Sequence, residues 1–260
     1  MKQGIDCLYK FKSLENKDYV LDIIENNRLY FPTRSQLNDP LEGVIQPIHY
    51  ATLGSSYFRE KGYLQPEFYS LLENYRILSL AQSWKNMQMW AHYSNNYNGV
   101  CIAFKYKDVF NDAKEVKYKS KKMKPVNADD ILQDEEFDTI VRRNLLCKSK
   151  NWEYEQECRI IRKTTEEFIN FSSDCIKEVI LGNVLKMDKD VVVELSRLCY
   201  EKNIKISHIV FCTDYFELYK ESFVLEEYLA EEYNSFVSND VIIIGDQQIQ
   251  AQLCHWTGNN

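Results

Sequence analysis

The stretch "IKEVILGNVLKMDKDVVVELSRLCYEKNIKISHIVF" (residues 176–211) contains two apolar segments on either side of a longer amphipathic one. Segments 176–182 and 204–211 have the length and the branched apolar residues of strands. The segment between them, 188–203, repeats its apolar residues at helical spacing. A strand, a helix and a second strand in succession favour a parallel, right-handed connection. We therefore predict a strand–helix–strand unit with parallel strands.

The rest of the chain mixes short strands with helices, and we find no internal repeat and no long linker. Strands are predicted over 5–11, 28–31, 76–83, 99–104, 114–118 and 153–161, and helices over 15–27, 66–74, 86–96, 128–147 and 216–234, with a late apolar run at 240–245. This pattern predicts an α+β fold with a mixed sheet core and flanking helices. We expect a core over residues 1–182 and a C-terminal extension over 183–260 packed on the same domain.

Composition bounds the class of protein. At 260 residues, with 45% hydrophobic and 27% charged residues, the chain can bury a sizeable core. A formal charge of −7 argues against a general nucleic-acid coat protein, although it leaves room for a local basic site. No apolar run approaches the roughly 18 residues of a membrane-spanning helix, and the first residues lack the apolar region of a signal peptide. We expect a cytoplasmic protein without a membrane partner.

The eight cysteines do not suggest a metal site. They are scattered at positions 7, 101, 147, 158, 175, 199, 212 and 254. No CxxC pair occurs and the four histidines lie far apart in the sequence, so the usual spacing of zinc ligands is absent. Most of these cysteines fall in apolar segments, where a free thiol behaves as a small hydrophobic group. We expect reduced cysteines and no bound metal.

A row of charges in "KNWEYEQECRII" (150–161) is the main candidate for a functional site. In the predicted strand, alternate side chains face the same way, so Glu155, Glu157 and Arg159 would share one face. Like charges at this distance repel each other. One interpretation is a solvent-facing edge strand, with salt pairing to Arg159. The other is a cleft wall, where two carboxylates divide acid/base and electrostatic roles beside an Arg suited to phosphate.

Three other motifs carry weaker signals. The lysine-rich stretch 117–124 could bind a phosphate backbone, but a solvated loop explains it equally well. "NDP" (38–40) is turn chemistry, and we expect Asn38 and Asp39 to bond nearby backbone amides in a rigid turn that lines the cleft. A lone helix histidine such as His92 is more often structural than catalytic. There is no P-loop and no GxGxxG, so the usual nucleotide cradles are absent.

Four motifs together resemble a known family. "LYKF" near the start, "LYFPTRSQLNDPLE", "MWAHYSNNYNGVCIAF" and "WEYEQECRI" occur in the order found in the bacterial family called domain of unknown function 2971. The resemblance covers roughly residues 7–182. The layout of that family in turn is similar to the ADP-ribosyltransferase fold. In that fold a first strand carries a cationic or aromatic residue, a middle strand carries a serine motif, and a later strand carries Glu-x-Glu.

The resemblance implies roles for particular residues. Glu157 would be the carboxylate that stabilises the ribose cation formed when NAD loses nicotinamide, and Glu155 would orient or deprotonate an acceptor. Tyr9 or Trp90 would stack on nicotinamide. The expected NAD contacts are Tyr9, Lys10, Arg34, Asn38, Asp39, Ser79, Ser83, Trp90, Tyr93 and Arg159.

The resemblance therefore implies an NAD-dependent ADP-ribosyltransferase with NAD as its substrate, acting as a bacterial toxin or phage-defence effector. Its acceptor would be a protein or a nucleic acid, and a protein partner could restrain it. Two alternatives stay open at this point. One is a non-enzymatic binding module in which Glu155, Glu157 and Arg159 form a salt network. The other is a nucleotide hydrolase or nuclease that uses the same carboxylates with a hydrated metal.

Overall fold

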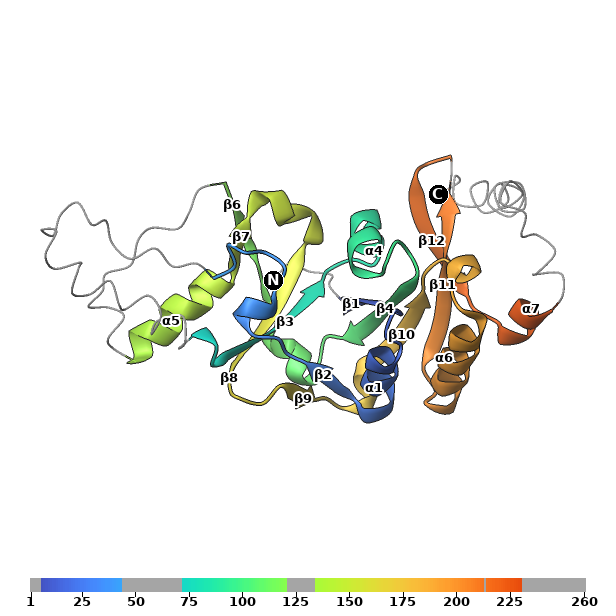
Figure 1. Ribbon diagram of the computed structural model, residues 1–260, viewed down its shortest axis with the longest axis horizontal. Helices are drawn as coiled ribbons and strands as arrows, with labels where there is room; N and C mark the ends of the chain where they lie inside the picture. Colours follow the sequence, from blue (N-terminus) through green and yellow to red (C-terminus); the bar gives the residue numbers. More distant parts are fainter. Residues whose placement is uncertain (1–5, 44–71, 121–133, 213, 231–260) are drawn as a thin grey trace, which may run out of the picture. The chain divides into compact units, whose positions relative to one another are not determined.

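The protein divides into two compact units, each made of segments distant in the sequence. The computed structural model describes residues 6–43, 72–120, 134–212 and 214–230 (Figure 1). Unit 1 comprises Met1–Asn27, Ser83–Tyr106 and Ser172–Asn260, and unit 2 comprises Arg28–Gln82 and Lys107–Phe171. The expected boundary after residue 182 stays a prediction.

Unit 1 is built on five strands in the order β12-β11-β10-β4-β1. Their bounds are β1 (Cys7–Ser13), β4 (Gly99–Lys105), β10 (Ile176–Leu181), β11 (Lys205–Cys212) and β12 (Glu217–Ser222). β10 and β11 are parallel, whereas the other neighbours are antiparallel. The sheet is therefore mixed, which confirms the predicted α+β class. The predicted strand–helix–strand unit is also confirmed, because α6 (Lys189–Glu201) lies between the parallel strands in sequence.

In the described part of unit 1, four α-helices accompany these strands: α1 (Asp18–Asn26), α4 (Met87–Tyr93), α6 and α7 (Leu225–Leu229). α1 and α6 lie side by side (Figure 1), and Lys17, just before α1, pairs with Glu194 of α6 at 2.5 Å. α4 packs on β1, where the ring of Trp90 meets Phe11 edge to face with 5.1 Å between centroids. Trp90 is fully buried, so α4 is fixed by its place in the core of unit 1.

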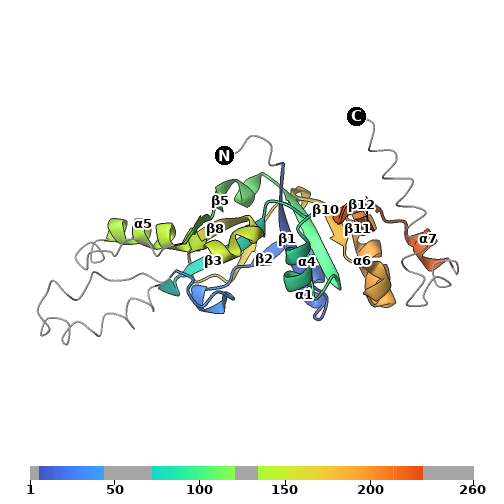
Figure 2. The same cartoon turned by 90° about the horizontal axis from the view of Figure 1, so that it is seen from above.

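Unit 2 contains the antiparallel strands β3 (Tyr75–Ala81), β8 (Glu157–Lys163) and β5 (Lys114–Glu115). Two further pairs are β2 (Arg28–Tyr30) with β9 (Phe168–Asn170), antiparallel, and β6 (Lys117–Lys119) with β7 (Cys147–Ser149), parallel. Figure 2 shows these strands from above, with α5 (Asp134–Leu145) beside them. The apolar core joins β3, β8 and α5 through Leu72, Tyr75, Ile77, Val141, Leu145 and Ile161.

Three predictions of local structure are wrong. The first residues of the predicted strand 153–161 belong to a 3-10 helix, Lys150–Glu155, and β8 begins only at Glu157, because Gln156 between them is left-handed (φ 45°). The predicted strand 114–118 is divided between β5 and β6. The acidic segment 216–234 begins with β12, which pairs with β11, before the short helix α7. The predicted helix 66–74 lies mostly outside the described residues, and the run 240–245 lies wholly outside them.

In the described part of the chain, no helix is long and apolar enough to cross a membrane. The seven cysteines within it are free thiols, and six of them are buried.

Candidate functional site

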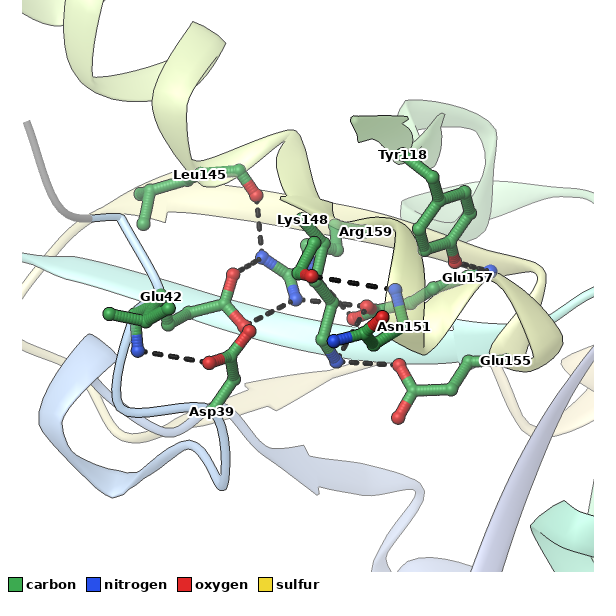
Figure 3. Close-up of polar contacts among 11 residues, drawn as sticks. Asp39, Glu42, Tyr118, Leu145, Lys148, Asn151, Glu155, Glu157 and Arg159 are labelled. Atoms are coloured by element: carbon green, nitrogen blue, oxygen red, sulfur yellow. Dashed lines mark hydrogen bonds and ion pairs between the residues drawn. The ribbon is translucent and has the colours of Figure 1, made fainter. Parts of the chain in front are cut away.

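The candidate site of unit 2 is centred on Arg159, a fully buried side chain of β8. A guanidinium has five N–H donors, and all five are used here. Nε donates to Oε1 of Glu157 at 2.6 Å, and one Nη2 donor reaches Oε2 of the same residue at 2.9 Å. Glu42 accepts from Nη1 and Nη2, the latter at 2.9 Å, and the carbonyl of Leu145 accepts the last donor at 2.6 Å. Arg159 is therefore held between two carboxylates (Figure 3).

A second cation completes the cluster. Lys148 of β7 is also buried, and its Nζ lies 2.5 Å from Oε2 of Glu155 and 3.5 Å from Oε2 of Glu157. The same ammonium lies 4.6 Å from the ring centroid of Trp152, within the range of a cation–π contact. We call Glu42, Lys148, Glu155, Glu157 and Arg159 the buried charge network. Its three carboxylates face two cations, so one negative charge is left when all five groups are ionised.

Glu42 reaches the network from a turn that lies just before the undescribed residues 44–71. Asp39 Oδ1 accepts the N–H of Leu41 at 2.9 Å, and the Asp39 carbonyl accepts the N–H of Glu42 at 3.0 Å. This confirms the predicted turn role of Asp39. Arg34 Nε donates to the Glu42 carbonyl at 2.5 Å. Gly43 follows at φ +59°, a conformation that residues with a Cβ rarely adopt.

Neighbouring strands fix Glu157 at both its backbone and its side chain. The N–H of Glu157 donates to the hydroxyl oxygen of Tyr118 on β6 at 2.7 Å (Figure 3). On β3, Ser79 is paired with Arg159 and Ala81 with Glu157, so Ser79 lies on the face that carries the network. The Ser79 hydroxyl hydrogen-bonds to the Glu157 carboxylate. Glu157 is thus oriented by two strands besides its own.

The two carboxylates on Arg159 differ in acidity. Burial alone raises the pKa of Glu157, but Arg159, Lys148 and Ser79 together bring it below its ordinary value. For Glu42 burial outweighs the contribution of Arg159, so its pKa is raised. Burial also opposes the charge of Arg159, yet Glu157 and Glu42 raise its pKa above the ordinary value. Paired groups whose pKa values are driven apart are typical of acid/base sites, although structural ion pairs do the same.

The predicted charged row is therefore wrong in its geometry. Glu155 lies on the 3-10 helix and pairs with Lys148, whereas Glu157 and Arg159 share a face of β8 and pair with each other. All three side chains are buried, as are Cys158 and Ile160 on the opposite face of the strand. The like charges do not form an open wall, because Arg159 lies between Glu42 and Glu157 and Lys148 contacts both Glu155 and Glu157.

The other predicted site residues fall into two groups. In unit 2, Ser79 and Arg159 lie next to Glu157. Arg34 and Asp39 each form a hydrogen bond with the backbone of Glu42. Asn38 lies in the same turn as Asp39. In unit 1 lie Tyr9, Lys10, Ser83, Trp90 and Tyr93. Ser83 Oγ accepts the N–H of Lys85 at 3.1 Å, which places it in a local turn. Trp90 is fully buried, and this argues against a contact between its ring and NAD.

Sequence reasoning missed Glu42, Lys148 and Tyr118. Glu42 is 117 residues from Arg159 in sequence, so no local spacing could reveal the pair. Lys148 and Tyr118 had a usable signal, because each is a single inward residue on a short strand whose neighbours point the other way. Lys117 and Lys119, flanking Tyr118, are exposed, as predicted for the lysine-rich stretch; Lys121, Lys122 and Lys124 lie outside the described residues.

A metal site was not expected. Among the side chains that the structure describes, no group of three or more His, Cys, Asp or Glu residues is placed to hold a metal ion.

Comparison with known proteins gives one family match. Residues 89–160 match the model of a family described as "Protein of unknown function (DUF2971)". The matched part includes "MWAHYSNNYNGVCIAF" and "WEYEQECRI", but not the two earlier motifs, so it is shorter than the expected range of 7–182. No curated protein and no solved structure matches the chain. The further likeness to ADP-ribosyltransferases stays a prediction.

Proposed function

We propose that the protein is an NAD-dependent ADP-ribosyltransferase whose central carboxylate is Glu157. The observation that supports this most is the register of β3 against β8, which pairs Ser79 with Arg159 and Ala81 with Glu157. An ADP-ribosyltransferase-like site requires its serine strand and its glutamate strand to meet. Here β3 and β8 are direct neighbours, and a hydrogen bond from Ser79 helps to lower the pKa of Glu157.

The chemistry of the reaction suits such a carboxylate. Cleavage of the bond between nicotinamide and ribose develops positive charge on the sugar, as glycosidic cleavage does. A carboxylate that is already ionised and held in place stabilises this charge without reorganising during the reaction. The lowered pKa of Glu157 and its bonds to Ser79 and Arg159 provide both properties.

Glu155 takes the second role in the proposal. It is a separate carboxylate on the same cation, since Lys148 Nζ contacts both glutamates. Deprotonating or orienting an acceptor requires a group near, but distinct from, the one that stabilises the sugar. The acceptor would be a protein or a nucleic acid. A role as a toxin or phage-defence effector with a restraining partner belongs to the same proposal.

A second candidate is supported by a specific observation. Arg159 is saturated by Glu157, Glu42 and the Leu145 carbonyl, and its carboxylate partners are as buried as it is. In this second candidate the closed network only fixes the fold of a non-enzymatic binding module and takes no part in chemistry. The two candidates differ in whether the protein acts on NAD.

Incubation of the purified protein and a cell lysate with NAD labelled in its adenylate part separates them. The transferase proposal predicts label in the protein or the nucleic-acid fraction, with nicotinamide released in equal amount. Absence of label from both fractions, with NAD left intact, would favour the binding module. Release of nicotinamide without labelled acceptor would identify a hydrolase of NAD instead.

A further inference from the structure

A second buried charge cluster lies in unit 1, around Glu178 of β10. The Glu178 side chain is 4% exposed, and both of its oxygens are engaged. Oε1 accepts from Ser207 Oγ at 2.9 Å and lies 3.3 Å from Lys205 Nζ, while Oε2 pairs with Lys220 Nζ. Burial alone raises the pKa of Glu178, but Lys220, Ser207 and Lys205 together lower it. One ionised carboxylate thus pairs with two lysines, Lys205 of β11 and Lys220 of β12.

An aromatic ring lies beside these lysines. The ring centroid of Trp84 is 5.2 Å from Lys220 Nζ and 5.8 Å from Lys85 Nζ. Lys85 Nζ is also 5.3 Å from the ring centroid of Tyr219. Trp84 is half-buried, and its backbone carbonyl accepts the indole N–H of the buried Trp90 at 2.7 Å, which fixes the position of its backbone.

Three lysines lie around this ring and Glu178. Lys205 and Lys220 pair with the Glu178 carboxylate, whereas Lys85 contacts the rings of Trp84 and Tyr219. Lys85 is exposed and the Lys205 side chain is 58% exposed, so both ammonium groups are within reach of a ligand. This group of lysines contrasts with the net charge of −7 of the chain.

We propose that Trp84, Lys85, Lys205 and Lys220 form a binding site for an aromatic base that carries phosphate. An indole offers a π face on which any base can stack, and neighbouring cations strengthen the contact. Lysine ammonium groups bind phosphate as point charges, without demanding one geometry. The ligand is a free nucleoside diphosphate or an unpaired nucleotide of a single strand. This goes beyond the proposed function, because none of these four residues was expected to contact NAD.

Titration calorimetry on the full-length protein tests the site with three probes: ADP, inorganic pyrophosphate and a short single-stranded oligoadenylate. ADP should bind at least about tenfold more tightly than pyrophosphate, because only ADP can stack. Tighter binding of the oligoadenylate than of ADP would identify a strand as the natural ligand, and the reverse a free nucleotide. ADP is also a part of NAD and could bind an NAD site, so variants of Trp84, Lys85 and Lys205, which lie outside the expected NAD contacts, decide whether the titrated site is this one.

Variants locate the binding. Trp84→Ala should abolish the preference for ADP over pyrophosphate, with Trp84→Phe retaining it. Lys85→Met with Lys205→Met should weaken ADP binding at least about tenfold, since two phosphate contacts are lost. Lys114→Met, an exposed lysine of unit 2, is the control and should change nothing. If ADP does not bind, or binds the Lys85 and Lys205 variant as tightly as the wild type, the proposal is overturned. The Trp84 ring would then have only a structural role beside Lys220 of β12.

Discussion

Arg159 Nε lies 2.6 Å from Oε1 of Glu157, two residues earlier on the same strand. The pair exists because alternate residues of a strand share a face, and it is buried because Glu42 and Leu145 close over the guanidinium. Burying charged groups is costly unless each is paired and hydrogen-bonded. We propose that this network holds Glu157 ionised and oriented for chemistry.

Replacing Arg159 should be the most damaging single change in the network. Arg159→Met leaves Glu42 and Glu157 buried without their shared cation, and removing one partner of a buried pair costs about 3–5 kcal/mol. Arg162→Met on the same strand is the matched control. Its contact with Asp112 is largely exposed, so its loss should cost about 1 kcal/mol or less. Urea unfolding of both variants measures the difference, and equal losses would contradict the buried role of Arg159.

The two carboxylates on Arg159 should respond to pH in opposite directions. The folded-state pKa of Glu157 is lowered, so its ionisation contributes stability above the ordinary value of 4.5 that is lost as the pH falls through the folded-state pKa. The folded-state pKa of Glu42 is raised. Its contribution is complete below 4.5 and is lost as the pH rises through the folded-state pKa.

Glutamine keeps the shape of each side chain without the charge. Two glutamine variants therefore show whether each carboxylate contributes more to the free energy of unfolding at high or at low pH. Relative to the wild type, Glu157→Gln should lose more free energy of unfolding at pH 7 than at pH 4, and Glu42→Gln should lose less at pH 7 than at pH 4. Denaturant unfolding at several pH values gives both curves. If the loss of free energy of unfolding changes with pH in the same direction for both variants, the two glutamates are equivalent partners of Arg159 and this prediction is wrong.

Gly43 should be intolerant of a side chain. Its φ of +59° and a Cβ position 2.8 Å from Leu145 Cδ2 both oppose alanine. The left-handed conformation alone costs a residue with a Cβ about 1–2 kcal/mol. Gly43→Ala should lower the free energy of unfolding by at least this amount, and Gly43→Asn should lower it as well, because asparagine tolerates the left-handed conformation but has the same Cβ beside Leu145. Thermal unfolding ranks the two, and an alanine variant as stable as the wild type would rule out the strained turn.

The strand–helix–strand unit could be predicted from the sequence because its signals are local. Its helix shows 3.6-residue periodicity, and the apolar residues of β10 and β11 are contiguous. The helix predicted over 216–234 is wrong at β12 because an edge strand carries charges such as Glu217 and Lys220. Such charges are equally common on the surface of a helix. The 3-10 helix at 150–155 was missed because the alternating pattern continues through Gln156, whose left-handed backbone ends it.

The site could be predicted only in part. Glu157 and Arg159 share a strand, so their pairing follows from spacing. Their partners Glu42 and Lys148 come from a turn and another strand, and contacts between such segments depend on the packing of unit 2. The signal that pointed to burial was the single inward residue on each of two short strands, Lys148 on β7 and Tyr118 on β6.

The rate of nicotinamide release from NAD tests the proposed role of Glu157 most directly, measured for the wild type, Ser79→Ala and Glu157→Gln, each shown by circular dichroism to be folded. We expect release by the wild type and a fall of about two orders of magnitude or more for Glu157→Gln, the scale for losing one preorganised electrostatic group. Ser79→Ala should fall between the two, since it loses one hydrogen bond to the same carboxylate. Release by folded Glu157→Gln at the wild-type rate, or none by the wild type above a heat-unfolded sample, would contradict it.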